Sequence, residues 1–251
     1  MEKRTSFPRS HPALRAWTAT AAAIESRVLL TILAASACLW GFLTLAGEVR
    51  EGETTGFDRT VLLAFRRVGD VATPVGPQWI QETARDITAL GGFTVLTLVT
   101  VLATVLLLMH GRRLQALIFA GSVIGAQVLV GALKAVLARA RPDLNTHLDL
   151  VSSHSFPSGH STMTPVVYLT LAAILAAGAE RRSVRLLLSG AAVVLVLAVG
   201  VSRVYLGVHW PTDVLAGWTL GTAIAVAASL ALHRAAPAPQ ATVVPDAPGT
   251  D

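Results

Sequence analysis

The feature that most constrains this chain is a set of six long runs without a charged residue. A run of about 20 apolar residues is long enough to cross the roughly 30 Å hydrocarbon core of a bilayer as a helix. In lipid every backbone polar group must be bonded internally, so apolar runs of this length cross the membrane as helices. We therefore predict an all-α, polytopic membrane protein with six transmembrane helices: Val28–Gly47, Ile87–Met109, Leu114–Leu133, Thr162–Ala179, Leu186–Ser202 and Val214–Leu232.

The composition agrees with this prediction. Of the 251 residues, 53% are hydrophobic and only 14% are charged, whereas soluble domains carry about 25% charged residues. The formal charge of +5 does not indicate a nucleic-acid partner, because the basic residues form short clusters between apolar runs, as they do in membrane proteins. Cys38 is the only cysteine, so the chain cannot form an internal disulfide.

The first run divides the chain into its expected parts. A cleaved signal peptide is an alternative interpretation, but its apolar core would span only about 7–15 residues, and Val28–Gly47 is longer. We therefore predict a basic cytosolic tail over residues 1–27 and a membrane domain over residues 28–234. Residues 235–251 are rich in Pro and Ala and are predicted to be a disordered tail.

The long loop after the first run contains one further expected element. Residues Asp58–Val68 alternate charged and apolar side chains before Pro74 and Gly76 interrupt the pattern. This pattern predicts a short helix lying in the membrane interface.

Two short connectors predict the orientation. His110–Arg113 and Glu180–Arg185 are both basic, and short basic loops remain on the cytosolic side of a membrane. Both termini are therefore expected in the cytosol. The polar loops that carry the chemically interesting residues should lie on the extracytoplasmic side of the cell membrane.

Lys134 and Arg141 follow the third run. They are seven residues apart, which is close to two turns, so a continuous helix would place both on one face. The dipeptide Arg141-Pro142 is expected to end that helix. The alternative is a pair of bases whose ends reach the interface and bind nothing.

Ser158, Gly159 and His160 precede the fourth run, in the sequence Pro157-Ser158-Gly159-His160. A turn that enters a helix presents backbone N–H groups and positive potential to an anion, and glycine lets a phosphate approach the backbone closely. His160 would then be placed to protonate a leaving oxygen. The alternative is an ordinary helix cap made by Ser158 or Ser161.

Arg203, His209 and Asp213 lie between the fifth and sixth runs. If Pro211 opens the last helix, as proline prefers, Asp213 lies in its first turn and can reach back to His209. A carboxylate on one ring nitrogen fixes the tautomer and leaves the other nitrogen as a nucleophile. Arg203 adds a planar cation suited to phosphate. An interfacial histidine beside a surface arginine is the alternative.

A metal site is not expected. His147, His154 and His160 are close in sequence, but the intervening loop lacks cysteine, and structural zinc sites need four such ligands. No carboxylate cluster is available to bind Mg²⁺. We therefore expect no metal and no other cofactor.

These three stretches resemble, in order, the signature of the type-2 phosphatidate phosphatase superfamily. They read Lys134-x6-Arg141-Pro142, Pro157-Ser158-Gly159-His160 and Ser202-Arg203-x5-His209-x3-Asp213. The resemblance implies that His209 takes the phosphoryl group, Asp213 orients it and His160 is the general acid. It implies that the phosphate is bound by the side chains of Lys134, Arg141 and Arg203 and by the amides of Ser158 and Gly159.

The resemblance leaves several functions open. The leading hypothesis is an integral-membrane phosphatase acting on a lipid phosphate or diphosphate: undecaprenyl diphosphate, phosphatidylglycerophosphate or phosphatidate. A lipid-linked phosphotransferase would use the same phosphohistidine, and a non-enzymatic membrane scaffold would use none of these residues. The expected partners are the lipid substrate and membrane lipid. The oligomeric state is not predicted.

Overall fold

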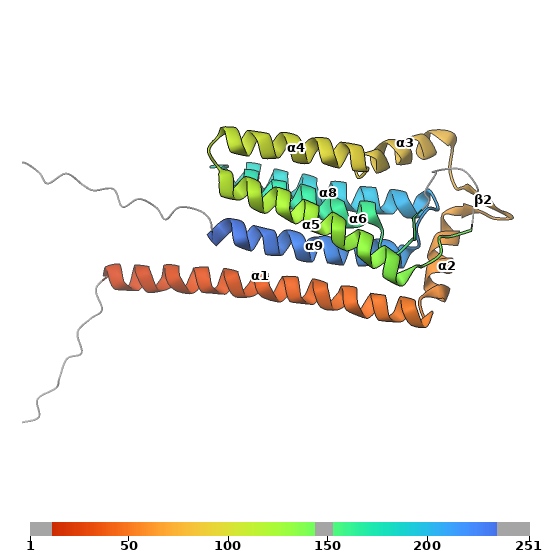
Figure 1. Ribbon diagram of the computed structural model, residues 1–251, viewed down its shortest axis with the longest axis horizontal. Coiled ribbons are helices and arrows are strands. Elements are labelled where there is room, and N and C mark those ends of the chain that lie inside the picture. The colour runs from red at the N-terminus through yellow and green to blue at the C-terminus, as the bar shows by residue number, and fades with distance from the viewer. Residues whose placement is uncertain (1–11, 144–152, 235–251) are drawn as a thin grey trace, which may run out of the picture.

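The protein is a bundle of long helices, seen here in a computed structural model that describes residues 12–143 and 153–234 (Figure 1). Six segments are long and apolar enough to cross a membrane, which confirms the predicted architecture. They are Val28–Glu51, Gln78–Met109, Arg113–Leu137, Gly159–Ala177, Arg182–Tyr205 and Pro211–Leu232.

The first and last helices pack side by side. Helix α1 (Pro12–Glu51) runs along the edge of the bundle against α9 (Pro211–Arg234) (Figure 1). Helix α1 begins well before the expected start of the first span, so residues 12–27 are helical. The predicted tail at 235–251 and His147 lie outside the described residues.

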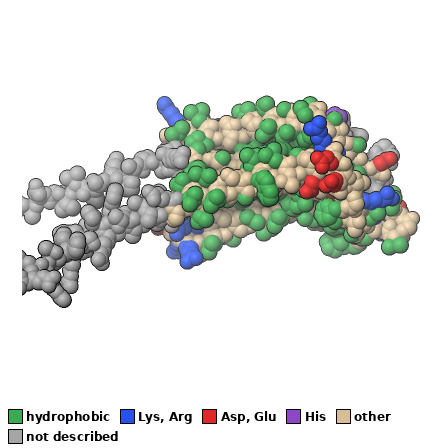
Figure 2. Space-filling model, turned by 90° about the horizontal axis from the view of Figure 1, so that it is seen from below, with side chains coloured by type: hydrophobic (Ala, Val, Ile, Leu, Met, Phe, Trp, Pro, Cys, Tyr) green, Lys and Arg blue, Asp and Glu red, His purple; other side chains and the backbone are tan. Residues whose placement is uncertain are grey.

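The outer surface has the charge distribution expected of a membrane protein. Figure 2 shows hydrophobic side chains over the length of the visible face, with basic side chains towards both ends and acidic side chains gathered towards one end. At one end, helix α2 (Thr55–Ala64) and the strand β2 (Asp70–Pro74) lie beyond the end of helix α5 (Arg113–Leu137) (Figure 1). This end also carries the predicted site residues.

The second span starts earlier than predicted. Helix α3 (Gln78–Ala89) and helix α4 (Phe93–Met109) form it together, with a short break between them. The charged residues of α3 lie before the uncharged run that defined the predicted span, so that run contained only the last residues of α3. The hydroxyl of Tyr168 donates to the carbonyl oxygen of Leu90 at 2.7 Å, which satisfies one backbone group at the break.

The predicted helix Asp58–Val68 is present but displaced. Helix α2 covers Thr55–Ala64 and is followed by a small antiparallel hairpin of β1 (Arg66–Arg67) and β2 (Asp70–Pro74). The hairpin turns at Gly69, whose φ of +82° is accessible mainly to glycine. Residues 65–68 are therefore outside the helix, contrary to the prediction from the charge pattern.

The fourth span begins at Gly159, before the predicted Thr162. It consists of α6 (Gly159–Thr164), a π-helical segment η1 (Pro165–Leu169) and α7 (Thr170–Ala177). Proline has no N–H to donate to the preceding turn, and the wide turn starts at this residue. The span approaches α9 closely at Gly217 and Gly221, where a Cβ would lie 2.8 Å from the Ser161 Cβ and 2.2 Å from the Thr162 carbonyl oxygen.

Helix α8 (Arg182–Tyr205) leads into the last connection, and α9 opens at Pro211 as predicted. The main apolar core lies on this side of the bundle, where Phe119 from α5 and Val166 and Val167 from η1 are fully buried. The core holds the inner spans in fixed positions below the predicted site residues.

Candidate active site

The predicted residues converge at one end of the bundle. They come from the end of α5 and the segment after it, the start of α6, the end of α8 and the start of α9. Three of them, Arg203, His209 and Asp213, are almost completely buried, with exposed fractions of 1%, 2% and 0%. Buried polar and charged side chains require hydrogen-bond partners, and these partners determine the orientation and protonation of each group.

Asp213 lies in the first turn of α9, as the position of Pro211 predicts. Its Oδ2 is 3.4 Å from Nδ1 of His209 and accepts a hydrogen bond from the backbone N–H of Trp210 at 2.9 Å. Ser155 lies between the two groups: its hydroxyl is 3.3 Å from the same Nδ1 and donates to Oδ2 of Asp213. The imidazole is therefore oriented by a carboxylate and a serine together.

The contacts of His209 define its tautomer. Arginine is a donor only, and the terminal Nη1 of Arg141 lies 3.1 Å from Nε2 of His209. Nε2 must therefore be the acceptor nitrogen, and Nδ1 carries the proton that faces Ser155 and Asp213. The lone pair of Nε2 therefore points at the guanidinium of Arg141, a permanent cation.

The imidazole is neutral in this environment. Burial is the largest effect and lowers the pKa of His209 to about 3, against the opposing influence of Asp213. Arg141 and Arg203 lower the pKa further, because neighbouring cations disfavour a charged ring. A neutral ring retains the nucleophilic lone pair throughout the physiological pH range.

The expectation that Lys134 and Arg141 share one helix face is wrong. Helix α5 ends at Leu137 because Ala138 adopts a left-handed conformation with φ of +45°. Arg141 nevertheless lies close to Lys134: both side chains donate to the carbonyl oxygen of His154. The irregular segment after α5, and not helical periodicity, brings the two cations together.

Arg141 is also bonded to the connection that carries His209. Its Nη1 donates to the carbonyl oxygen of Val208 at 2.6 Å, and its Nε donates to that of Ser153 at 2.8 Å. Arg203 approaches from α8 and donates to the hydroxyl of Thr88 on α3 at 3.1 Å. The three cations thus belong to three separate segments that meet around His209.

The prediction for the Ser158 amide needs correction. Its N–H already donates to the carbonyl oxygen of Asp213 at 3.0 Å, and the residue is completely buried. The side chain of Ser158 caps α6 by accepting from the N–H of Ser161. The amide of Gly159 belongs to the first helical turn, whose N–H groups have no acceptor within their own helix, so it stays a predicted candidate for an anion.

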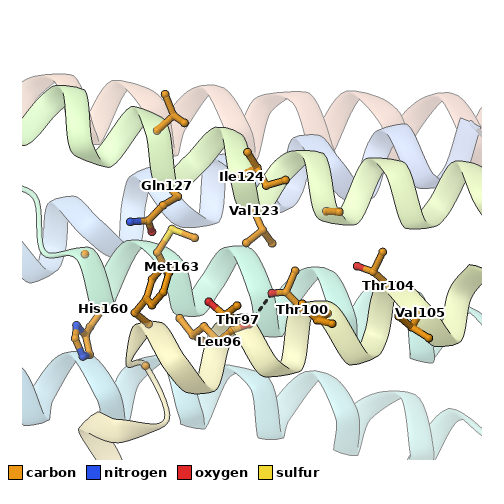
Figure 3. A pocket seen from close by; sticks show the side chains of 16 residues that line it. Leu96, Thr97, Thr100, Thr104, Val105, Val123, Ile124, Gln127, His160 and Met163 are labelled. Atoms are coloured by element: carbon orange, nitrogen blue, oxygen red, sulfur yellow. Dashed lines mark hydrogen bonds between the residues drawn. The ribbon is translucent and has the colours of Figure 1, made fainter.

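An apolar groove extends from His160 along the side of the bundle. It has a volume of about 560 Å³ and lies mainly between α4 and α5. Figure 3 shows His160 at one end and Thr104 and Val105 at the other. Phe93, Val101 and Ile124 line it and are more than half exposed on the side of the bundle, which is the surface that faces lipid.

Sequence analysis missed Arg139, Asp58 and Ser155. Arg139 bonds to Asp213 and also to the completely buried Asp58 of α2. The alternating pattern of α2 gave no sign that Asp58 would be buried. Ser155 stands close to the predicted turn in sequence, and this proximity was the only available indication of its role.

The site does not have the composition of a metal centre. Within residues 12–143 and 153–234, no group of three His, Cys, Asp or Glu side chains is placed to hold a metal ion. The polar groups around His209 are instead the guanidinium of Arg141, the hydroxyl of Ser155 and the carboxylate of Asp213.

The geometry thus defines an integral membrane protein that holds a buried histidine, its carboxylate partner and an arginine at one end of the helix bundle. The comparisons with known proteins identify the family. The profile of the PAP2 superfamily matches residues 115–236, and the chain belongs to this superfamily. The family resemblance inferred from the three motifs is therefore confirmed.

Three relatives illustrate the similarity. Phosphatidylglycerophosphatase B of Bacillus subtilis is 32% identical over 185 residues, which cover 72% of this chain and 85% of the relative. Decaprenylphosphoryl-5-phosphoribose phosphatase of Mycobacterium tuberculosis is 34% identical over 145 residues, covering 57% and 75%. The crystal structure of the PAP2-type phosphatidylglycerolphosphate phosphatase from Bacillus subtilis superposes with a TM-score of 0.69 at 29% identity, covering 77% of this chain and 93% of that chain.

Proposed function

We propose that this protein is an integral-membrane phosphatase that hydrolyses a lipid phosphate or diphosphate through a phosphohistidine at His209. The observation that carries the proposal is the position of Nε2, which is unprotonated and lies 3.1 Å from Arg141. The names of the relatives, phosphatases of a glycerolipid and of a prenyl lipid, support the reaction class.

In this proposal the cations neutralise the transferred group. Lys134, Arg141 and Arg203 contact the phosphate oxygens, together with amides of the first turn of α6. Phosphoryl transfer depends mainly on positioning and on stabilising charge spread over the equatorial oxygens. Fixed side-chain cations can supply that stabilisation without a metal ion.

His160 is the proposed general acid. It lies on α6 at the end of the apolar groove, where the leaving oxygen of a substrate would meet the site. Proton transfer to a leaving group by a positioned histidine contributes about 10²–10⁴-fold to a rate. Water would then hydrolyse the phosphohistidine, with His209 as the leaving group.

The groove supports a substrate with a hydrophobic tail. A lipid could keep its head group at the cations while part of its chain lies between α4 and α5. A water-soluble sugar phosphate would leave the groove empty. We therefore propose either a prenyl diphosphate or a glycerolipid phosphate, and the extracytoplasmic site favours undecaprenyl diphosphate, whose diphosphate would have to be exposed on that side.

A phosphate-release assay in detergent micelles tests this function. The panel contains undecaprenyl diphosphate, phosphatidylglycerophosphate and phosphatidate, each with a short-chain version of the same head group. We expect release from at least one long-chain lipid, a higher kcat/KM for the long chain, and no turnover by His209→Ala. Equal kcat/KM for both chain lengths would refute the lipid preference. A phosphorylated acceptor in place of free phosphate would identify a phosphotransferase.

The orientation is also a proposal. The basic connectors support cytosolic termini and an extracytoplasmic site. Val68 lies at the tip of the hairpin on the site end and is fully exposed, so it is a suitable reporter. In a Cys38→Ala background, Val68→Cys should react with a membrane-impermeant thiol reagent in intact cells. Labelling only after lysis would reverse the orientation.

A further inference from the structure

Arg139 lies between two buried carboxylates. Its Nη1 donates to Oδ1 of Asp213 at 2.6 Å and its Nη2 donates to Oδ2 of Asp58 at 2.6 Å. The side chain of Arg139 is 15% exposed, and those of the two aspartates are 0–1% exposed. A planar guanidinium suits this position because it can bond to groups on two sides at once.

The remaining donors of Arg139 are also used. Nη1 donates to the hydroxyl of Thr212 at 2.9 Å, and Nη2 donates to that of Thr54 at 3.2 Å. The guanidinium carbon lies 5.7 Å from the centre of the Trp210 ring. All four terminal N–H groups of Arg139 therefore have acceptors within the protein.

Asp58 connects this arginine to helix α9. Its Oδ1 accepts from the backbone N–H of Thr212 at 2.9 Å, and its Oδ2 accepts from the Thr212 hydroxyl at 2.7 Å. A carboxylate at the first turn of a helix satisfies a free N–H group and suits the local positive potential. Asp58 therefore holds α2 against the start of the helix that carries Asp213.

The two oxygens of Asp213 have separate partners. Oδ1 accepts from Arg139, whereas Oδ2 faces Ser155, the Trp210 N–H and His209. A carboxylate held at one oxygen cannot rotate without losing the bonds at the other. The bond to Arg139 thus determines the direction in which Oδ2 faces the imidazole.

We infer that Arg139 and Asp58 are positioning residues, which hold the carboxylate of Asp213 towards His209 and, through it, aim Nε2 at the phosphate. The inference rests on the proposed function of His209. Arg139 holds the carboxylate of Asp213 in place. Asp58 holds Arg139 in place and partly neutralises the charge of its guanidinium. Without Asp58, the full charge of the guanidinium would act on Asp213 and weaken its hold on the imidazole.

This role predicts a defect in rate and not in substrate binding. Residues that orient the ligands of a metal ion from one contact away contribute about 10- to 100-fold to activity, and we take the same scale for a residue that orients Asp213. We expect Arg139→Gln and Asp58→Asn each to lower kcat by about 10- to 100-fold without raising KM. Asn at position 58 retains the oxygen that accepts from Thr212, so this change removes the charge and leaves an acceptor for α9.

A double-variant cycle separates positioning from independent structural effects. If Asp58 acts through Arg139, the variant with both changes should have nearly the kcat of Arg139→Gln alone, because coupled residues are not additive. If the losses in kcat of the two single variants multiplied in the double variant, the inference would be overturned. A raised KM with an unchanged kcat would also overturn it. Arg59→Gln is the matched control, because Arg59 is the exposed neighbour of Asp58 on α2, and its kcat should equal that of the wild type.

The Arg139→Lys variant is a control for misfolding of the Arg139→Gln variant. Lysine keeps the positive charge between the two carboxylates, but one ammonium group cannot replace four directed N–H groups. We expect this variant to elute as a folded protein in detergent with a kcat between those of wild type and Arg139→Gln. A kcat equal to that of the wild type would show that charge alone suffices and would overturn the positioning role.

The ring nitrogens of His209 give a readout that does not depend on turnover. In protein labelled with ¹⁵N-histidine, His209 is assigned by comparison with His209→Ala. We expect the Nδ1–H tautomer in the wild type and a mixture of tautomers in Arg139→Gln. An unchanged tautomer in that variant would refute positioning even if the wild type hydrolysed no lipid. Absence of hydrolysis with a shifted tautomer would refute the proposed function alone.

Discussion

Replacing Gly221 with alanine tests whether α6 and α9 must lie in contact for the site to form. A Cβ at this position would lie 2.2 Å from the carbonyl oxygen of Thr162 and 3.1 Å from Cγ of Pro165. A carbon–oxygen contact requires about 3.3 Å, so the helices must separate by about 1 Å. Since the obstacle is a backbone oxygen, no change of rotamer can relieve it.

The separation should affect both stability and rate. Overpacking typically costs about 1–3 kcal/mol, and the helix preference of alanine returns about 1 kcal/mol. A net loss of about 1 kcal/mol lowers the Tm of a domain of this size by about 2–4 °C. Because α6 carries His160 and α9 carries Asp213, a shift of 1 Å can also lower kcat/KM by about 10²-fold.

Two quantities are measured on the same preparation. One is the Tm in detergent, monitored by tryptophan fluorescence, and the other is kcat/KM for phosphate release. Gly190→Ala is the control, because Gly190 lies within α8 and a Cβ added there would have nothing within 4 Å. The control should match or exceed the Tm of the wild type and keep its activity. If Gly221→Ala matched the wild type in both measurements, the close contact of α6 and α9 would not support the site.

Three further predictions concern the chemistry. His160→Ala should lower kcat by about 10²–10⁴-fold with a lipid phosphate and far less with an activated aryl phosphate; equal losses would exclude a general acid. Asp213→Asn should lower kcat by about 10³–10⁴-fold by favouring the wrong tautomer, and an unchanged kcat would contradict the pairing. Activity should persist in EDTA and be inhibited by vanadate; loss restored by Mg²⁺ or Zn²⁺ would reveal a metal site.

The spans and the motif residues could be predicted because their signals are local. Six uncharged runs define six spans by length alone. The spacing of His209 and Asp213 places them one turn apart if Pro211 opens the helix, which it does. The start of the second span at Gln78 could not be predicted in this way, because α3 carries charged residues before the uncharged run although these residues are helical.

The position of Arg141 shows a second limit. Pro142 indicated the end of a helix, but the chain leaves α5 at Ala138, in a left-handed conformation that alanine seldom adopts. Ala138 is not a residue type that predicts a left-handed turn. Contacts made after the turn, including the bond from Arg141 to the carbonyl oxygen of Val208, hold the segment in place and depend on the folded structure.

Asp58 was the least predictable member of the site. It is 81 residues from Arg139 in sequence, and a charge in an amphipathic pattern normally indicates an exposed face. Its burial depends on Thr212 and Arg139, which supply the hydrogen bonds that a buried carboxylate needs. Sequence periodicity contains no information on whether such partners exist elsewhere in the chain.

The formal charges explain why the site needs both carboxylates. Asp58 and Asp213 carry two negative charges and Arg139 carries one positive charge, so this buried group has a net charge of −1. The three proposed phosphate ligands, Lys134, Arg141 and Arg203, carry +3, and the neutral imidazole adds nothing. The site as a whole is therefore at +2, which matches a phosphate monoester carrying about −1.5 to −2 charges near neutral pH.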